Sequence, residues 1–125
     1  MKKLNFTITA MLIVFTGTVS SAEWYEGGSL SNSGILEWQE ATPQNKLATS
    51  ADFVALMFQK KMLKSEIIKT IGSVNDIKPY AVELATCIEG VTAKNPDEDA
   101  NRKMFINQTV TGMATLCIFT MGWNK

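Results

Sequence analysis

The cysteine at position 87 constrains the fold of this chain most, because it lies within the segment that has the clearest helical pattern. Apolar residues recur every three or four positions between residues 77 and 91, the spacing that lines one face of an α-helix. This face consists of Ile77, Tyr80, Ala81, Leu84, Cys87, Ile88 and Val91. The other cysteine is Cys117, in the last apolar segment. A bond between the two cysteines would therefore join two elements distant in the sequence.

The first 22 residues predict an export signal. Two lysines precede an uncharged and mostly apolar run over residues 4–19, and small residues follow at positions 20–22, as a signal peptidase requires. The run is shorter than the roughly 20 apolar residues that span a bilayer comfortably, so we favour cleavage after Ala22 over a retained anchor. We therefore expect a periplasmic or secreted protein.

Export would place the two cysteines in an oxidising compartment, which favours a disulfide over free thiols. We expect an intramolecular Cys87–Cys117 bond, with buried free thiols or an intermolecular bond as alternatives. A simple helical hairpin around Pro96 would keep the cysteines apart, about 12 Å before the turn and about 33 Å beyond it at 1.5 Å per residue. The bond thus requires an irregular segment after Lys94, a break at Gly112 or steeply crossing helices.

The overall pattern predicts an all-α fold, a small bundle of three to four helices with a flexible N-terminal arm. Residues 23–47 are expected to form this arm, including a short helix over 35–41, and residues 48–125 the helical domain. Within the domain we expect a helix that starts at the N-cap Thr49 and runs to about residue 63. A second short helix over 65–71, or an extension of the first, precedes the helix over 77–91.

The segment over residues 104–123 contains no charged side chain. It is long enough to cross a membrane, but Asn107, Gln108 and several threonines lower its hydropathy, so we favour a buried helix. Its expected inner face comprises Ile106, Val110, Met113, Ala114, Cys117 and Met121. Because apolar residues also occupy its other side, we expect that side to contact a protein partner or a second copy of the chain. The alternative is a membrane-associated accessory protein of an envelope or secretion system that uses residues 104–123 as a membrane or partner helix.

Composition argues against several chemistries. The chain has no histidine, which excludes Ser-His-Asp catalysis and His-ligated zinc, and it has no phosphate-binding glycine loop. Without residues 1–22 it carries 10 basic and 12 acidic side chains, a balance unsuited to nucleic acid. Acids and amides alternate from Asn95 as in a calcium loop, but Ala100 and Ile106 replace its glycine and bidentate acid. We therefore expect no enzyme, no cofactor, no metal and no nucleic-acid partner.

Two groups of side chains are candidates for contact with a protein partner: the aromatic Trp24, Tyr25 and Trp38, and the acidic Asp97, Glu98 and Asp99. Alternatively, the aromatic residues dock the arm on its own domain, and the acidic residues begin a helix. In format, the expected exported helical chain with one cysteine pair is similar to small periplasmic immunity proteins and acid-stress chaperones. This likeness is one of format alone and carries over no site residue. Our preferred interpretation of the sequence is a non-enzymatic protein that acts by binding another protein, as an inhibitor or as a chaperone.

Overall fold

The computed structural model describes residues 22–125. Residues 1–21 of the predicted export signal therefore lie outside the described part of the chain. The described residues form six α-helices and one short 3-10 helix, and their β-type pairing is limited to two isolated bridges. The elements are α2 (Ile35–Glu40), α3 (Pro43–Gln59), α4 (Ser65–Ile68), η1 (Val74–Ile77), α5 (Lys78–Val91), α6 (Glu98–Phe105) and α7 (Val110–Thr120). Since α2 and α4 are short, α3, α5, α6 and α7 make up most of the helical bundle, which confirms the predicted fold class.

Helix α5 is the centre of this bundle, and α3 and α7 both pack on it. It follows η1 directly, and Pro79 lies in its first turn, where the missing N–H would have had no helical partner. Ala81, Leu84 and Ile88 on its inner face are fully buried. The helix predicted over 77–91 is thus confirmed, with its first residue belonging to η1.

Helix α3 begins earlier than the sequence pattern predicted. Its N-cap is Thr42, whose hydroxyl accepts a hydrogen bond from the backbone N–H of Asn45 at 3.1 Å. The predicted cap, Thr49, is instead buried within the helix, where its Oγ1 accepts a hydrogen bond from the backbone N–H of Leu30 at 3.2 Å. The predicted start was therefore wrong, and residues 43–47, assigned to the arm, belong to α3.

Residues 104–123 do not form one helix. Helix α6 ends at Phe105, and α7 begins after the N-cap Thr109, whose hydroxyl accepts from the N–H of Gly112 at 3.0 Å. Ile106, predicted to be internal, lies in the connecting loop and is 51% exposed, whereas Val110 is buried as expected. Within residues 22–125, no helix is both long enough and apolar enough to cross a membrane.

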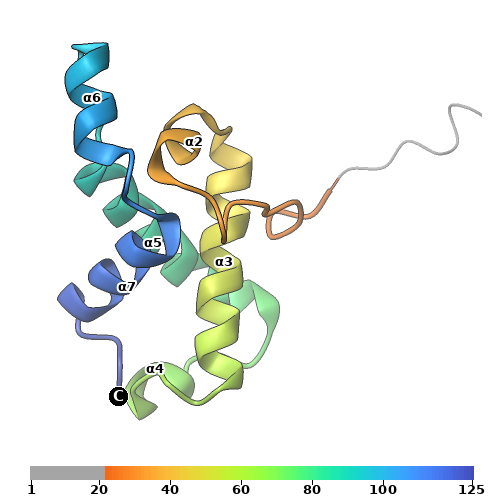
Figure 1. The fold of residues 1–125 in the computed structure, drawn as a ribbon. Helices are drawn as coiled ribbons and strands as arrows, with labels where there is room; N and C mark the ends of the chain where they lie inside the picture. Colours follow the sequence, from red (N-terminus) through yellow and green to blue (C-terminus); the bar gives the residue numbers. More distant parts are fainter. Residues whose placement is uncertain (1–21) are drawn as a thin grey trace, which may run out of the picture.

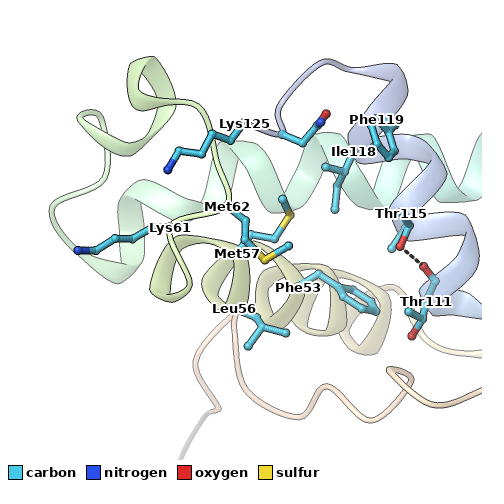
Figure 2. A pocket seen from close by; sticks show the side chains of 12 residues that line it. Phe53, Leu56, Met57, Lys61, Met62, Thr111, Thr115, Ile118, Phe119 and Lys125 are labelled. Atoms are coloured by element: carbon cyan, nitrogen blue, oxygen red, sulfur yellow. Dashed lines mark hydrogen bonds between the residues drawn. The ribbon is translucent and has the colours of Figure 1, made fainter.

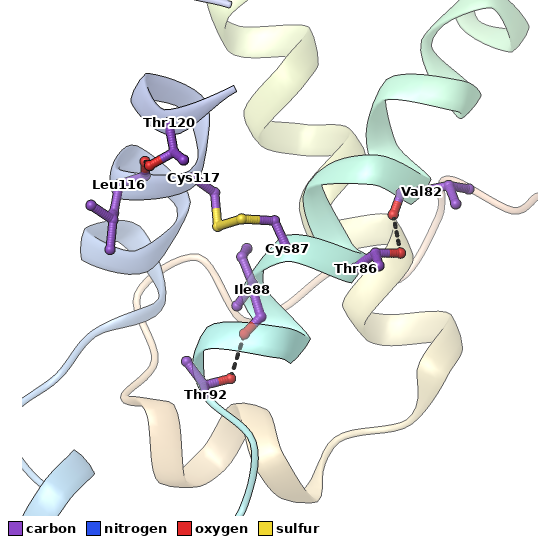
Figure 3. Close-up of a disulfide and its surroundings, with 8 residues drawn as sticks. All are labelled: Val82, Thr86, Cys87, Ile88, Thr92, Leu116, Cys117 and Thr120. Atoms are coloured by element: carbon purple, nitrogen blue, oxygen red, sulfur yellow. Dashed lines mark hydrogen bonds between the residues drawn. A yellow bond between two sulfur atoms is a disulfide. The ribbon is translucent and has the colours of Figure 1, made fainter. Parts of the chain in front are cut away.

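The disulfide between Cys87 and Cys117 joins α5 to α7 (Figure 3). Its Cα atoms are 6.0 Å apart, within the usual range for such a bond. The intramolecular bond is confirmed, and the free-thiol and intermolecular alternatives are wrong. Of the three geometries that would allow the bond, an irregular segment is present over residues 92–97, whereas Gly112 lies within α7 and is not a break. A further break over residues 106–109, which the sequence pattern did not predict, separates α6 from α7, and α6 runs back toward α7 (Figure 1).

After α7 the chain folds back against the turn between α3 and α4. Gly122 adopts φ +70°, a left-handed conformation that glycine reaches without strain. The N–H of Lys64 donates to the carbonyl of Trp123, and the N–H of Lys125 donates to the carbonyl of Met62, both at 2.9 Å. These bonds bring Lys125 beside the end of α3.

Candidate binding groove

An apolar groove of about 480 Å³ lies between α3 and α7 (Figure 2). Both helices pack on α5, which lies behind the groove, so the space between them is left open. It is lined by Phe53, Leu56, Met57, Lys61, Met62, Thr111, Ala114, Thr115, Ile118, Phe119, Asn124 and Lys125. We refer to this site as the apolar groove.

The rim of the apolar groove exposes large hydrophobic side chains. Leu56 of α3 is 48% exposed, Met62 in the following turn 49%, and Phe119 of α7 64%. The side of α3 that contains Val54 is buried in the core, while Leu56 remains in contact with solvent. Helix α3 therefore has apolar side chains on all sides because one side packs in the core and another lines the groove.

Two threonines of α7 contribute to the groove with their hydroxyl groups already hydrogen-bonded. Thr115 donates to the carbonyl of Thr111 at 2.8 Å, as drawn in Figure 2, and Thr111 donates to the carbonyl of Ser31 at 2.7 Å. Because these hydroxyl protons are engaged within the chain, a bound molecule would meet mostly apolar atoms on this wall. The groove is therefore suited to an apolar surface.

Lys61 and Lys125 are the two charged residues among those that line the groove. Lys61 follows the end of α3 and adopts φ +57°, the left-handed conformation that glycine usually provides at this position. The N–H of Lys61 donates to the carbonyl of Phe58 at 3.1 Å, and the N–H of Met62 donates to that of Met57 at 2.9 Å. The helix end thus holds a lysine backbone in a strained conformation beside the groove.

Trp38 does not lie on the surface. Its side chain is fully buried, its Nε1 donates to Glu89 Oε1 at 2.9 Å, and Lys46 Nζ lies 5.7 Å from the ring centroid. Lys46 also pairs with Glu89 at 3.0 Å. The expectation that Trp38 contacts a partner is therefore wrong for this conformation, since it is a core residue that joins α2 to α5.

Trp24 and Tyr25 dock the irregular segment 23–34 on its own domain. Both are half-buried, and Trp24 Nε1 donates to Asn75 Oδ1 at 3.1 Å. Gln44 Nε2 donates to three backbone carbonyls of this segment, those of residues 23, 24 and 26. The alternative interpretation, in which these aromatic residues hold the arm in place, accounts for the contacts that are observed.

Asp97, Glu98 and Asp99 lie at the start of α6, exposed and at the end of the molecule opposite to α4 (Figure 1). The Asp97 carboxylate accepts hydrogen bonds from the N–H groups of Asp99 and Ala100, so it caps the helix. Residues 22–125 contain no group of three or more acidic or cysteine side chains placed to hold a metal ion. The groove and these acidic residues are separate features.

Three carboxyl groups have a lowered pKa, those of Glu40, Glu66 and Asp76, and none of them lines the apolar groove. Hydrogen bonds from the backbone N–H groups of Gly72 and Ser73 lower the pKa of Asp76, the former having the larger effect. The hydrogen bond and the charge of Lys94 lower the pKa of Glu40. Both carboxylates tie chain segments together, and neither lines the groove.

The sequence matches no protein-family model, and neither a curated protein nor a solved structure is significantly similar to the chain. The function must therefore be inferred from the site. The sequence held one signal for the groove, the excess of apolar residues in α3 and in the last segment, but it did not indicate that these two surfaces would face each other.

Proposed function

We propose that this chain is an exported, non-enzymatic protein that acts by binding another protein through the apolar groove. The observation that carries the proposal is the exposure of Leu56, Met62 and Phe119 around one concave apolar site. Contiguous apolar surface of this kind commonly marks an interaction site, because leaving it in water is unfavourable. A partner at the outer side of the last segment, as the sequence led us to expect, would contact Phe119 on this rim.

Export is supported by two independent features. The first 22 residues have the pattern of a signal peptide, and the Cys87–Cys117 disulfide is consistent with an oxidising compartment. We therefore propose that the protein works in the periplasm or outside the cell, after removal of its signal.

The disulfide favours a single specific partner over a range of unfolded clients. It holds α7, one wall of the groove, against α5, on which α3 also packs. A site with fixed walls loses little conformational freedom on binding and suits a complementary partner surface. We accordingly propose the inhibitor-like or immunity-like mode of action in preference to the chaperone-like mode.

Site-specific photocrosslinking in the producing cells tests this proposal. A photoreactive phenylalanine analogue at Phe119 should give one discrete adduct with another protein, because this side chain is on the groove rim and is 64% exposed. The same analogue at Met104 of α6, which is 55% exposed and outside the groove, is the matched control and should not give that adduct. Mass spectrometry would then identify the partner.

The purified partner should bind the protein directly and lose affinity for the variant Phe119→Ser. Absence of any adduct at Phe119, or the same adducts from both positions, would contradict the proposal. A wide range of client proteins instead of one adduct would contradict the inhibitor-like mode.

A further inference from the structure

We propose that the occupant of the apolar groove is an amphipathic helical segment of the partner protein, with acidic side chains at the end that meets Lys61 and Lys125. This inference rests on the proposed function and specifies the chemistry of the partner. It follows from the length of the groove, the position of its apolar residues and its charge.

The dimensions of the groove match about two turns of a helix. On α7 it extends from Thr111 to Phe119, a span of eight residue steps or about 12 Å at 1.5 Å per step. On α3 the lining residues Phe53, Leu56 and Met57 follow the spacing of one helix face. A helix lying between these walls would insert side chains spaced at i, i+3 or i+4, and i+7, the usual mode of helix-in-groove recognition.

The apolar surface extends onto the rim, which favours a macromolecular occupant over a small ligand. A volume of about 480 Å³ would accommodate a small molecule, but such a ligand would leave much of Leu56 and Phe119 in water. Leu116, which is 51% exposed on the same helix, continues the apolar surface of α7 beyond the groove lining. A helix with apolar side chains can cover both the interior of the groove and its rim.

The charge of the groove indicates which helix would fit. Lys61 and Lys125 are exposed lining residues at one end of the groove, where Figure 2 shows both side chains extending outward, and no acidic residue is among the twelve lining residues. Aspartate or glutamate on the partner would complement these lysines, whereas a basic helix would be repelled. The complementary end of the partner helix is therefore acidic.

The backbone of Lys61 supplies an independent argument. At φ +57° a glycine would be relaxed, so a lysine there is held at an energetic cost. A strained residue at a helix end that also lines a groove is consistent with a requirement for its side chain. We infer that Lys61 is kept in this position for its charge.

A peptide selection on the oxidised protein purified from producing cells tests the inference. The probe is a display library of 14-residue helix-forming peptides in which apolar and charged positions are randomised. Enriched peptides should carry apolar residues at i, i+3 or i+4, and i+7, with aspartate or glutamate at one end. The best peptide should bind at least tenfold more weakly to Phe119→Ser than to the wild type.

Two lysine variants separate charge from folding. Lys61→Gly should weaken binding of the best peptide about three- to tenfold. The difference should disappear in 0.5 M salt, because salt screens an exposed ion pair between Lys61 and an acidic residue of the peptide. Its melting temperature should be no lower than that of the wild type, since glycine relieves the backbone strain. Lys60→Ala, a change of the neighbouring exposed lysine outside the groove, should leave the affinity unchanged.

Several results would overturn the inference. These are the absence of enriched peptides, enrichment of peptides that lack acidic residues, and binding of the best peptide by Lys61→Gly as tight as by the wild type. Binding of dodecanoate in place of any peptide would indicate a small anionic ligand, and self-association abolished by Phe119→Ser would indicate a second copy. If Phe119 still crosslinks to one protein while these tests fail, the proposed function stands and only the acidic helix is wrong.

Discussion

At the scale of single residues, the Asp76 carboxylate organises the turn that leads into the central helix. It accepts hydrogen bonds from the backbone N–H groups of Gly72 at 2.8 Å and Ser73 at 3.0 Å, and from the Ser73 hydroxyl at 3.3 Å. The bond from Gly72 contributes most to the lowered pKa of Asp76, because it favours the ionised carboxylate. This one side chain therefore fixes the entry of the chain into η1 and α5.

The lowered pKa predicts a pH-dependent contribution of Asp76 to stability. An acid whose pKa is lower in the folded state stabilises the fold above its ordinary pKa of about 3.9, and this stabilisation is lost as the pH falls through the folded value. Asp76→Asn should therefore lower the melting temperature at pH 7, and the difference from the wild type should be smaller at about pH 3, because this pH lies below the ordinary pKa of the carboxyl group.

Thermal unfolding followed by circular dichroism at both pH values measures this effect. Glu83→Gln, an exposed change on the outer side of α5, is the control and should have little effect at pH 7. An equal loss of stability in Asp76→Asn at both pH values would show that its charge is not what matters.

At the scale of secondary-structure elements, α7 depends on its attachment to α5. Helix α7 has eleven residues and packs on α5, to which the disulfide links it across a separation of 30 residues (Figure 3). An isolated helix of this length is only marginally stable in water, so the packing and the covalent bond determine its position. The groove wall that α7 provides depends on the same attachment.

Removal of the disulfide should destabilise the protein by about 3 to 4 kcal/mol, because a loop of this length is no longer closed in the unfolded state. The variant in which Cys87 and Cys117 are both replaced by serine should show this loss in urea denaturation. It should also bind the best groove peptide more weakly.

Reduced wild-type protein is the control, and its unfolding curve should approach that of the double variant. A wild type equally stable with and without reductant would contradict the prediction.

The sequence predicted the elements whose pattern is local and missed those that depend on tertiary contacts. The helix over 77–91 and the disulfide followed from apolar periodicity and cysteine number. The start of α3 did not, because Thr49 and Ser50 resemble cap residues until Leu30 and Lys46 are seen to satisfy their hydroxyl groups. Hydrogen bonds that appear only in the folded chain thus place Thr49 and Ser50 inside α3, although the local sequence pattern assigns them to its start.

The candidate site was the least predictable feature. Trp38 had the properties of an interface anchor, but it is fully buried, and its Nε1 donates a hydrogen bond to Glu89 of α5. The apolar excess in α3 and in the last segment was visible, yet a helix that is apolar all round does not reveal which side remains open. That information exists only once α3 and α7 are both placed on α5.

At the scale of the whole molecule, the irregular segment 23–34 connects distant parts of the fold. Its backbone approaches α3 closely at Gly28 and reaches the start of α7, where the N–H of Val110 donates to the carbonyl of Ser33 at 3.0 Å. Leu30 in this segment is 5% exposed and belongs to the core. The N-terminal segment is thus an integral part of the bundle.

The close approach of Gly28 to α3 makes this docking testable. A Cβ atom at Gly28 would lie 2.8 Å from the backbone nitrogen of Thr49 and 2.9 Å from the carbonyl carbon of Ala48, atoms that cannot move aside easily. Gly28→Ala should therefore lower the free energy of unfolding by about 1 to 3 kcal/mol.

The matched control is Gly90→Ala in α5, where an added Cβ meets open space. Alanine there should stabilise the protein by about 0.5 to 1 kcal/mol, because it favours the helix. Urea denaturation of both variants gives the comparison. If Gly28→Ala were as stable as the wild type, the segment would not be held against α3.

The return of the chain after α7 has a practical consequence for work with this protein. Lys125 is hydrogen-bonded to Met62 through its backbone N–H and lines the apolar groove. An affinity tag, fluorescent protein or other fusion joined after Lys125 would leave from the rim of the groove and obstruct the proposed partner helix sterically. Binding measured with such a fusion would underestimate the affinity, so labels are better attached at exposed positions of α6.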